Sequence, residues 1–166
     1  PSFPRSFKNF EYILDAINLL PSEIRHQIQV HLTINKGISK YGDYIFEKAK
    51  DFPEINCIGL ISRSEIEKYY NSIDALIFPS KMETWGLPLS EIKKYHKTIF
   101  ASNLDFAKET IGAYEKVSFF DPLKANELAN LITEYVSGNI VYQGNSATKD
   151  RNELKSWKEL FDYMIQ

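Results

Sequence analysis

Two glutamates, Glu83 and Glu91, flank a glycine loop in the segment ETWGLPLSE. An apolar run that closes with Pro79 and Ser80 precedes it, so the order strand, loop and helix N-terminus is predicted. Free backbone N–H groups and the positive end of a helix dipole favour phosphate at such a point. The two carboxylates are then free to accept hydrogen bonds from hydroxyl groups. A phosphate beside a polyol is the chemistry of a nucleotide sugar.

The elements that must position this segment alternate between strand and helix. Strands are predicted over 28–34, 55–61, 74–78, 98–101 and 117–120. Helices are predicted over 10–20, 41–50, 64–70, 87–95, 104–111 and 128–135, with a polar loop over 138–149 and a terminal helix over 150–166. The helix near residue 64 is expected to open with a capping box from Ser64 to Glu67.

This alternation predicts an α/β fold with a Rossmann-like, doubly wound and mainly parallel sheet. All 166 residues are interpreted as one domain. In such a sheet, ligands bind beyond the carboxyl ends of the strands. The loop that contains Glu83 and Gly86 follows a predicted strand and is therefore expected at this edge.

The composition is that of an ordinary globular domain, with 43% hydrophobic and 25% charged residues. A net charge of −2 gives no electrostatic basis for nucleic-acid binding, so no nucleic-acid partner is predicted. The single cysteine, Cys57, is expected in the core and favours a reducing, cytoplasmic setting. No apolar run reaches the length of a membrane span. Because the sequence starts at Pro1 without an initiator methionine, we expect a piece of a longer protein.

The segment around Glu83 and Glu91 resembles the E-x7-E signature of the retaining glycosyltransferases of family 4. Further segments agree with that family in order and spacing: Arg5, Lys8 and Asn9, then 56–59, 65–74, 77–80, 99–102, 109–112 and 119–122. The resemblance covers almost the whole chain. It implies the C-terminal, nucleotide-sugar-binding half of a two-domain GT-B enzyme, whose acceptor-binding N-terminal half is missing from this sequence.

The resemblance also implies roles for the loop residues. Glu83 would accept hydrogen bonds from the transferred sugar, and Glu91 from the ribose hydroxyls. The backbone N–H groups of Trp85, Gly86 and Leu87 would bind the distal phosphate and the sugar, and a glycine permits their close approach.

Cations would stabilise the negative charge that develops on the leaving diphosphate. Lys8 is the first candidate for this role and Arg5 the second, although Arg5 is closer to Lys8 than the family's arginine is to its lysine. Backbone near Gly59, Leu60 and Ile61 would bind the base. The resemblance implies that a hexose-type sugar is transferred with retention, by same-face attack that the departing phosphate assists.

Neither an Asp-x-Asp motif nor a His/Cys cluster is present, so no metal and no other cofactor is predicted. The family implies a glycan or lipid-linked acceptor, polysaccharide assembly, and work in the cytoplasm at the inner face of the membrane, with any peripheral membrane contact made by the missing half.

His96 and Thr98 stand where the family often has glycine and proline. Histidine tolerates the left-handed conformation needed at a helix end better than most residues.

Other interpretations of these residues remain open. Taken singly, Glu91 is a glutamate favoured at a helix start, Trp85 an apolar anchor of the loop, and Arg5 and Lys8 solvated charges. The scaffold could also serve as a non-catalytic interaction or regulatory domain, because fold does not determine function. A nicotinamide enzyme is disfavoured, since no G-x-G-x-x-G follows an early strand.

Overall fold

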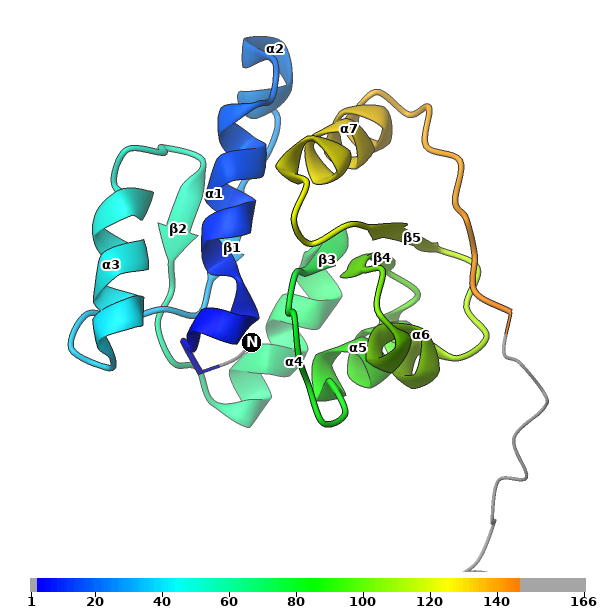
Figure 1. Ribbon diagram of the computed structural model, residues 1–166, viewed down its shortest axis with the longest axis horizontal. Helices are drawn as coiled ribbons and strands as arrows, with labels where there is room; N and C mark the ends of the chain where they lie inside the picture. The colour runs from blue at the N-terminus through cyan, green and yellow to red at the C-terminus, as the bar shows by residue number, and fades with distance from the viewer. Residues whose placement is uncertain (1–2, 147–166) are drawn as a thin grey trace, which may run out of the picture.

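A computed structural model describes residues 3–146, in which helices and strands alternate (Figure 1). The strands are β1 (Val30–Leu32), β2 (Ile55–Cys57), β3 (Ala75–Phe78), β4 (Thr98–Ser102) and β5 (Val117–Phe120). The helices are α1 (Phe10–Asn18), α2 (Ser22–Arg25), α3 (Lys40–Ala49), α4 (Arg63–Ser72), α5 (Leu87–Ile92), α6 (Asp105–Ile111) and α7 (Ala125–Val136), with 3-10 turns η1 (Ser6–Lys8) and η2 (Lys93–Tyr95). The predicted α/β class is confirmed. The predicted terminal helix over 150–166 lies outside the described residues.

The strands pair in parallel, as expected, but their hydrogen bonds form two sheets. β1 pairs with β2, and β4 lies between β3 and β5 in the second sheet. The facing edges of β1 and β3 do not pair with each other. A groove of about 560 Å³ separates them, lined by residues of both strands and by Phe100, Ile132 and Tyr135.

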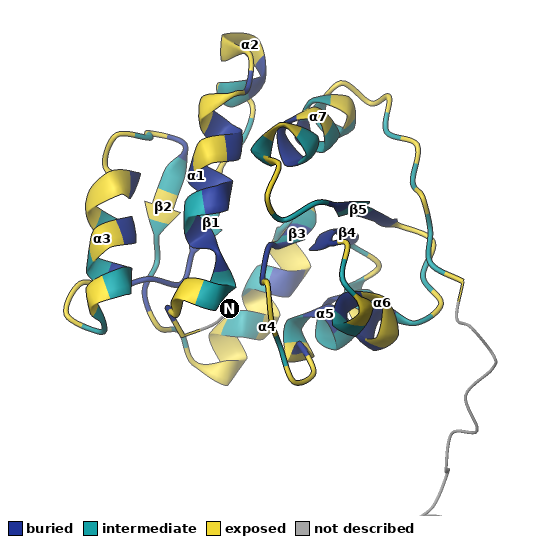
Figure 2. Cartoon of the chain, in the orientation of Figure 1, coloured by how far each residue is buried: buried dark blue, intermediate teal, exposed yellow. Residues whose placement is uncertain are grey.

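Helices cover both faces of the three-stranded sheet. On one face, Phe100 and Phe120 pack in a core with apolar residues of α1 and α7. On the other face, Ile99 and Val117 pack with apolar residues of α5 and α6. Figure 2 shows β4 in the dark blue of buried residues, and all five of its positions are buried. This double burial explains why the strand sequences are almost continuously apolar.

Two predicted strands are shorter than the sequence indicated. The strand expected over 55–61 ends at Cys57 because Gly59 adopts a φ of +75°, which is outside the strand region. The strand expected over 28–34 is reduced to β1, which has a hydrogen-bonded partner along only one edge. Cys57 is the last residue of β2, and burial raises the pKa of its thiol.

The capping box of α4 is one of the predictions that the structure corrects. Ser62, not Ser64, is the N-cap: its backbone N–H donates to Glu65 Oε2 over 2.7 Å, and its hydroxyl accepts from the Glu65 N–H. Ser62 has extended backbone, with φ −69° and ψ 165°, as an N-cap requires. The helix therefore begins at Arg63, which brings this arginine into the first helical turn.

The left-handed conformation expected at His96 is confirmed. Its φ is +54°, and its backbone N–H donates to Lys93 O at the end of η2. Among the described residues, no helix is both long and apolar enough to cross a membrane.

Candidate functional site at the carboxyl ends of the strands

The loops that follow β1, β2 and β3 leave the carboxyl ends of parallel strands, where ligands of such folds bind. Figure 1 shows turn η1, the start of α4 and the loop between β3 and α5 in the lower half of the molecule. The candidate site is built from these three segments.

Lys8 and Glu83 meet in an ion pair at this edge. Lys8 Nζ donates to Glu83 Oε1 over 2.5 Å, and the two side chains are only 16% and 11% exposed. A backbone hydrogen bond from Lys81 N to Phe7 O, 2.8 Å long, ties the same two segments together. The structure therefore brings the first predicted cation and the first predicted carboxylate into direct contact.

Asn9 links the turn before α1 to two loops. It is buried, has a left-handed backbone with φ +59°, and donates from Nδ2 to the carbonyl oxygens of Pro79, over 3.2 Å, and Pro122, over 3.0 Å. The sequence pattern included Asn9, but its role as the connector was not predicted. The one indication in the sequence was that asparagine tolerates a left-handed backbone better than most residues, as the turn before α1 requires.

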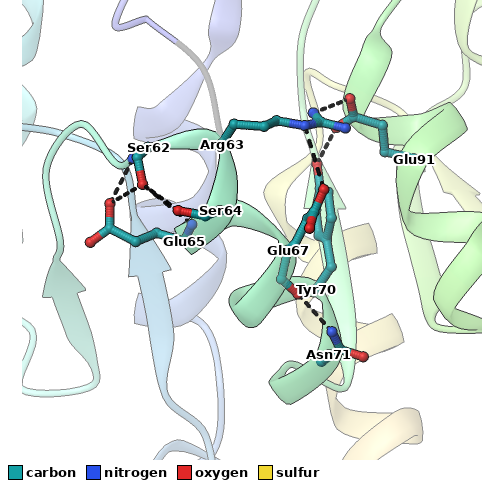
Figure 3. Close-up of polar contacts among 8 residues, drawn as sticks. All are labelled: Ser62, Arg63, Ser64, Glu65, Glu67, Tyr70, Asn71 and Glu91. Atoms are coloured by element: carbon teal, nitrogen blue, oxygen red, sulfur yellow. Dashed lines mark hydrogen bonds and ion pairs between the residues drawn. The ribbon is translucent and has the colours of Figure 1, made fainter.

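Glu91 lies on α5, and both of its carboxylate oxygens have partners on α4 (Figure 3). Arg63 Nη1 donates to Oε1 over 2.5 Å, and Tyr70 OH donates to Oε2 over 3.0 Å. The hydrogen bond that Arg63 donates to Glu91 raises the pKa of Arg63. Burial, followed by the charge of Glu91, raises the pKa of Tyr70. Sequence analysis missed Arg63, which the misplaced capping box left outside the helix, and Tyr70, whose contact with Glu91 spans 21 positions.

The loop before α5 presents unpaired backbone donors. Gly86 has a φ of +79° and precedes the helix as its N-cap. Within the described residues, the N–H groups of Trp85, Gly86 and Leu87 donate to no other group. The side chains of Trp85 and Leu87 are exposed, and the Thr110 hydroxyl donates to the Trp85 carbonyl oxygen. The loop is thus anchored through a carbonyl while its N–H groups remain available.

The segment predicted to bind the base follows β2. Gly59 is buried, Ile61 is partly buried, and the side chain of Leu60 is exposed. A Cβ atom on Gly59 would lie 2.2 Å from Oδ1 of Asn35, so the Asn35 carboxamide lies directly on this glycine. Asn35 follows β1 and was not among the predicted site residues.

Arg5 is placed differently from Lys8. Its guanidinium lies over the ring of Phe3, 5.2 Å from the centroid, and the side chain is exposed. No ion pair joins Arg5 to Glu83 or Glu91 among the described residues. The same part of the chain contains no cluster of three or more His, Cys, Asp or Glu residues that could hold a metal ion.

A family model described as glycosyl transferases group 1 matches residues 4–155. The chain belongs to the group 1 glycosyl transferases. Among solved structures, the Anabaena protein Alr3699/HepE, determined in complex with UDP, matches with a TM-score of 0.68 and 19% sequence identity. The match covers 82% of this chain and 37% of the Anabaena chain, and at this identity it concerns the fold alone. No curated protein matches this chain significantly.

In this group 1 glycosyl transferase chain, each predicted glutamate has one cationic partner at the site edge, Lys8 for Glu83 and Arg63 for Glu91. An ionised carboxylate has about four acceptor positions. Each glutamate therefore retains capacity to accept from hydroxyl groups. Free N–H groups lie in the loop that joins the two glutamates, and the arrangement can bind a charged group and hydroxyl groups together.

Proposed function

We propose that this chain is the donor-binding domain of a retaining glycosyltransferase of family 4, which takes a nucleoside diphosphate sugar. The carrying observation is the pair of partnered carboxylates, Glu83 with Lys8 and Glu91 with Arg63. They lie on either side of a loop whose N–H groups have no partner within residues 3–146. Membership of the group 1 glycosyl transferases supports the reaction class. The UDP bound to the Anabaena protein of similar fold supports a nucleotide donor.

In this proposal Glu83 accepts hydrogen bonds from the hydroxyls of a hexose-type sugar, and Glu91 accepts from the ribose hydroxyls. The N–H groups of Trp85, Gly86 and Leu87 bind the distal phosphate. Backbone of the segment from Gly59 to Ile61 binds the base, beside Asn35.

Lys8 stabilises the charge that develops on the bridging phosphate oxygen as the bond from the sugar C1 to that oxygen breaks. The nucleoside diphosphate leaves with the electron pair. An acceptor hydroxyl forms the new bond to C1 on the same face, and its proton passes to the departing phosphate oxygen. Arg5 is the second cation proposed for this charge, and it would have to leave Phe3 to reach it.

The acceptor is a glycan or a lipid-linked glycan, bound by an N-terminal domain that this sequence does not contain. We place the reaction in polysaccharide assembly, in the cytoplasm and at the inner membrane face, with any membrane contact made by that other domain. No metal ion or other cofactor is required in the proposal.

Calorimetric titration with UDP, GDP, ADP and their sugar conjugates tests the proposed donor site. One nucleotide should bind saturably, and Glu91→Ala should weaken it about tenfold or more, since hydrogen bonds to charged groups contribute about 1.5–3 kcal/mol. Glu83→Ala should spare the bare nucleotide and weaken only the sugar conjugate. Glu47→Ala is the matched control, because this exposed glutamate on α3 pairs with Lys36 and Lys50.

Two further outcomes would contradict the proposal in different ways. If Glu83→Ala and Glu91→Ala both bind the conjugate like the parent, the assigned roles are wrong. If a folded chain binds nothing in the panel, and a protein with its N-terminal domain also binds nothing, the chain is a non-catalytic interaction or regulatory domain.

A further inference from the structure

The carboxylate of Glu91 is held by two side chains that come from a different helix. Tyr70 and Arg63 lie two turns apart on α4, and each donates to a different oxygen of Glu91 (Figure 3). A glutamate on a surface helix would normally sample several rotamers, whose loss opposes binding. With both oxygens bonded, the plane of this carboxylate is fixed before any ligand arrives.

Tyr70 is the buried member of the pair. It is 2% exposed, packs in the core shared by α5 and α6, and has its ring 5.5 Å from that of Tyr95. The hydroxyl is therefore directed to Glu91 by packing of the whole ring. A tyrosine hydroxyl is protonated at neutral pH, and burial raises the pKa of Tyr70 further, so it donates throughout the neutral range.

Arg63 is the exposed member, at 63% of its side chain. Its place is set by the capping box of Ser62 and Glu65, which starts α4 at Arg63. Glu67, one turn further along α4, forms a second ion pair with Arg63, in which Oε1 lies 3.9 Å from Nε. The arginine keeps a positive charge beside the Glu91 carboxylate, to which its Nη1 donates.

We propose that Tyr70 and Arg63 are positioning residues, which orient Glu91 so that it accepts from the two vicinal hydroxyls of a ribose and makes the site selective for ribonucleotides over 2′-deoxyribonucleotides. This inference rests on the proposed function and extends it to the sugar of the nucleotide. Sites built to hydrogen-bond a hydroxyl reject an analogue without it, because the acceptor is then left unpaired. A freely rotating Glu91 could re-orient to bond with the remaining 3′-hydroxyl or with water, and would discriminate less.

The test measures dissociation constants of UDP and 2′-deoxy-UDP by calorimetry, with the GDP and ADP pairs in parallel. The parent chain should prefer the ribonucleotide about tenfold, the value of one hydrogen bond to a charged group. Tyr70→Phe should lower this ratio several-fold and leave affinity for the 2′-deoxy compound unchanged, an effect that a general loss of structure would not produce. Tyr69→Phe is the matched control, because it removes a hydroxyl from the neighbouring residue of α4, whose ring faces His31.

Arg63→Ala is an independent test of how Glu91 is positioned, since an exposed side chain can be removed without disturbing the core. It should also lower the ribose preference, and Arg63→Lys, which keeps a charged donor, should restore part of it. If Tyr70→Phe does not fold, Arg63→Ala alone decides.

The outcomes distinguish failure of the ribose inference from failure of the proposed function. A parent chain that binds both compounds equally overturns the ribose inference and leaves nucleotide binding standing. The same inference fails if the parent prefers ribose and folded Tyr70→Phe and Arg63→Ala keep the full ratio. Absence of binding by every nucleotide, also in the presence of the N-terminal domain, overturns the proposed function and the ribose inference together.

Discussion

Lys8 and Glu83 are 75 positions apart in the sequence and form an ion pair in which Nζ and Oε1 are 2.5 Å apart. Both side chains are largely shielded from water, at 16% and 11% exposure. The stability of a charge that is shielded from water depends on its ion-pair partner, because little solvent is available to take the partner's place. The pair therefore joins the turn before α1 to the loop after β3.

Removing the cation from this pair should destabilise the domain. Lys8→Met leaves the Glu83 carboxylate poorly solvated, and we expect the free energy of unfolding to fall by about 2–3 kcal/mol, below the value for fully buried pairs. Urea unfolding followed by circular dichroism measures the change. Lys8→Met combined with Glu83→Gln should recover part of the loss, because the unpaired charge is gone.

Lys50→Met is the control for that series. Lys50 pairs with Glu47 on the surface, where both side chains are about half exposed. Exposed pairs contribute at most about 1 kcal/mol, so its change should be small. Equal effects of Lys8→Met and Lys50→Met would mean that the buried pair does not persist in solution.

Asn9 offers a separate test of the same junction. Asn9→Gly keeps the left-handed backbone but loses the hydrogen bonds to Pro79 and Pro122, which should cost about 1–3 kcal/mol. Asn9→Ala loses the same bonds and must also hold a φ of +59°, which adds about 1 kcal/mol. Urea unfolding should therefore rank the parent above Asn9→Gly and Asn9→Ala last. Equal stability of the two variants would contradict the left-handed backbone.

Much of the fold could be predicted from periodicity. The apolar runs around Leu76, Ile99 and Val117 predicted the three strands of the larger sheet, because a strand buried on both faces has few polar positions. The ends of β1 and β2 could not be predicted in the same way. They depend on the backbone angle of Gly59 and on which edges pair, and neither follows from hydrophobicity alone.

The site was predictable only in part for a related reason. Glu83 and Glu91 stand out because they flank a glycine loop, and a local pattern is visible in the sequence. The contacts of Glu91 with Arg63 and Tyr70 span 28 and 21 positions, so no local pattern contains them. Arg63 became a candidate only when the start of α4 was known.

Gly59 should not tolerate a side chain. In Gly59→Ala the Cβ atom would lie 2.2 Å from Asn35 Oδ1, and the backbone would be strained at a φ of +75°. We expect a loss of about 2–3 kcal/mol in urea unfolding, of which the strain is about 1 kcal/mol. Adding Asn35→Ala should remove the overlap and leave the strain. If Gly59→Ala with Asn35→Ala is no more stable than Gly59→Ala alone, the carboxamide does not lie on this glycine.

Acid sensitivity should come in part from Glu54, which is buried and accepts from Arg25 Nε over 2.7 Å and from Nη2 over 3.1 Å. The hydrogen bond from Arg25 lowers the pKa of Glu54 in the folded protein. A lowered folded-state pKa means that the stabilisation is complete above the unfolded pKa of about 4.3 and is lost as the pH falls through the folded value. Glu54→Gln should therefore be less stable than the parent at pH 7, and the difference should shrink below about pH 4.

Glu23→Gln, at an exposed position of α2, should show no such convergence in urea unfolding at each pH. A difference between Glu54→Gln and the parent that stays constant down to pH 3 would mean that the carboxylate gains nothing from Arg25.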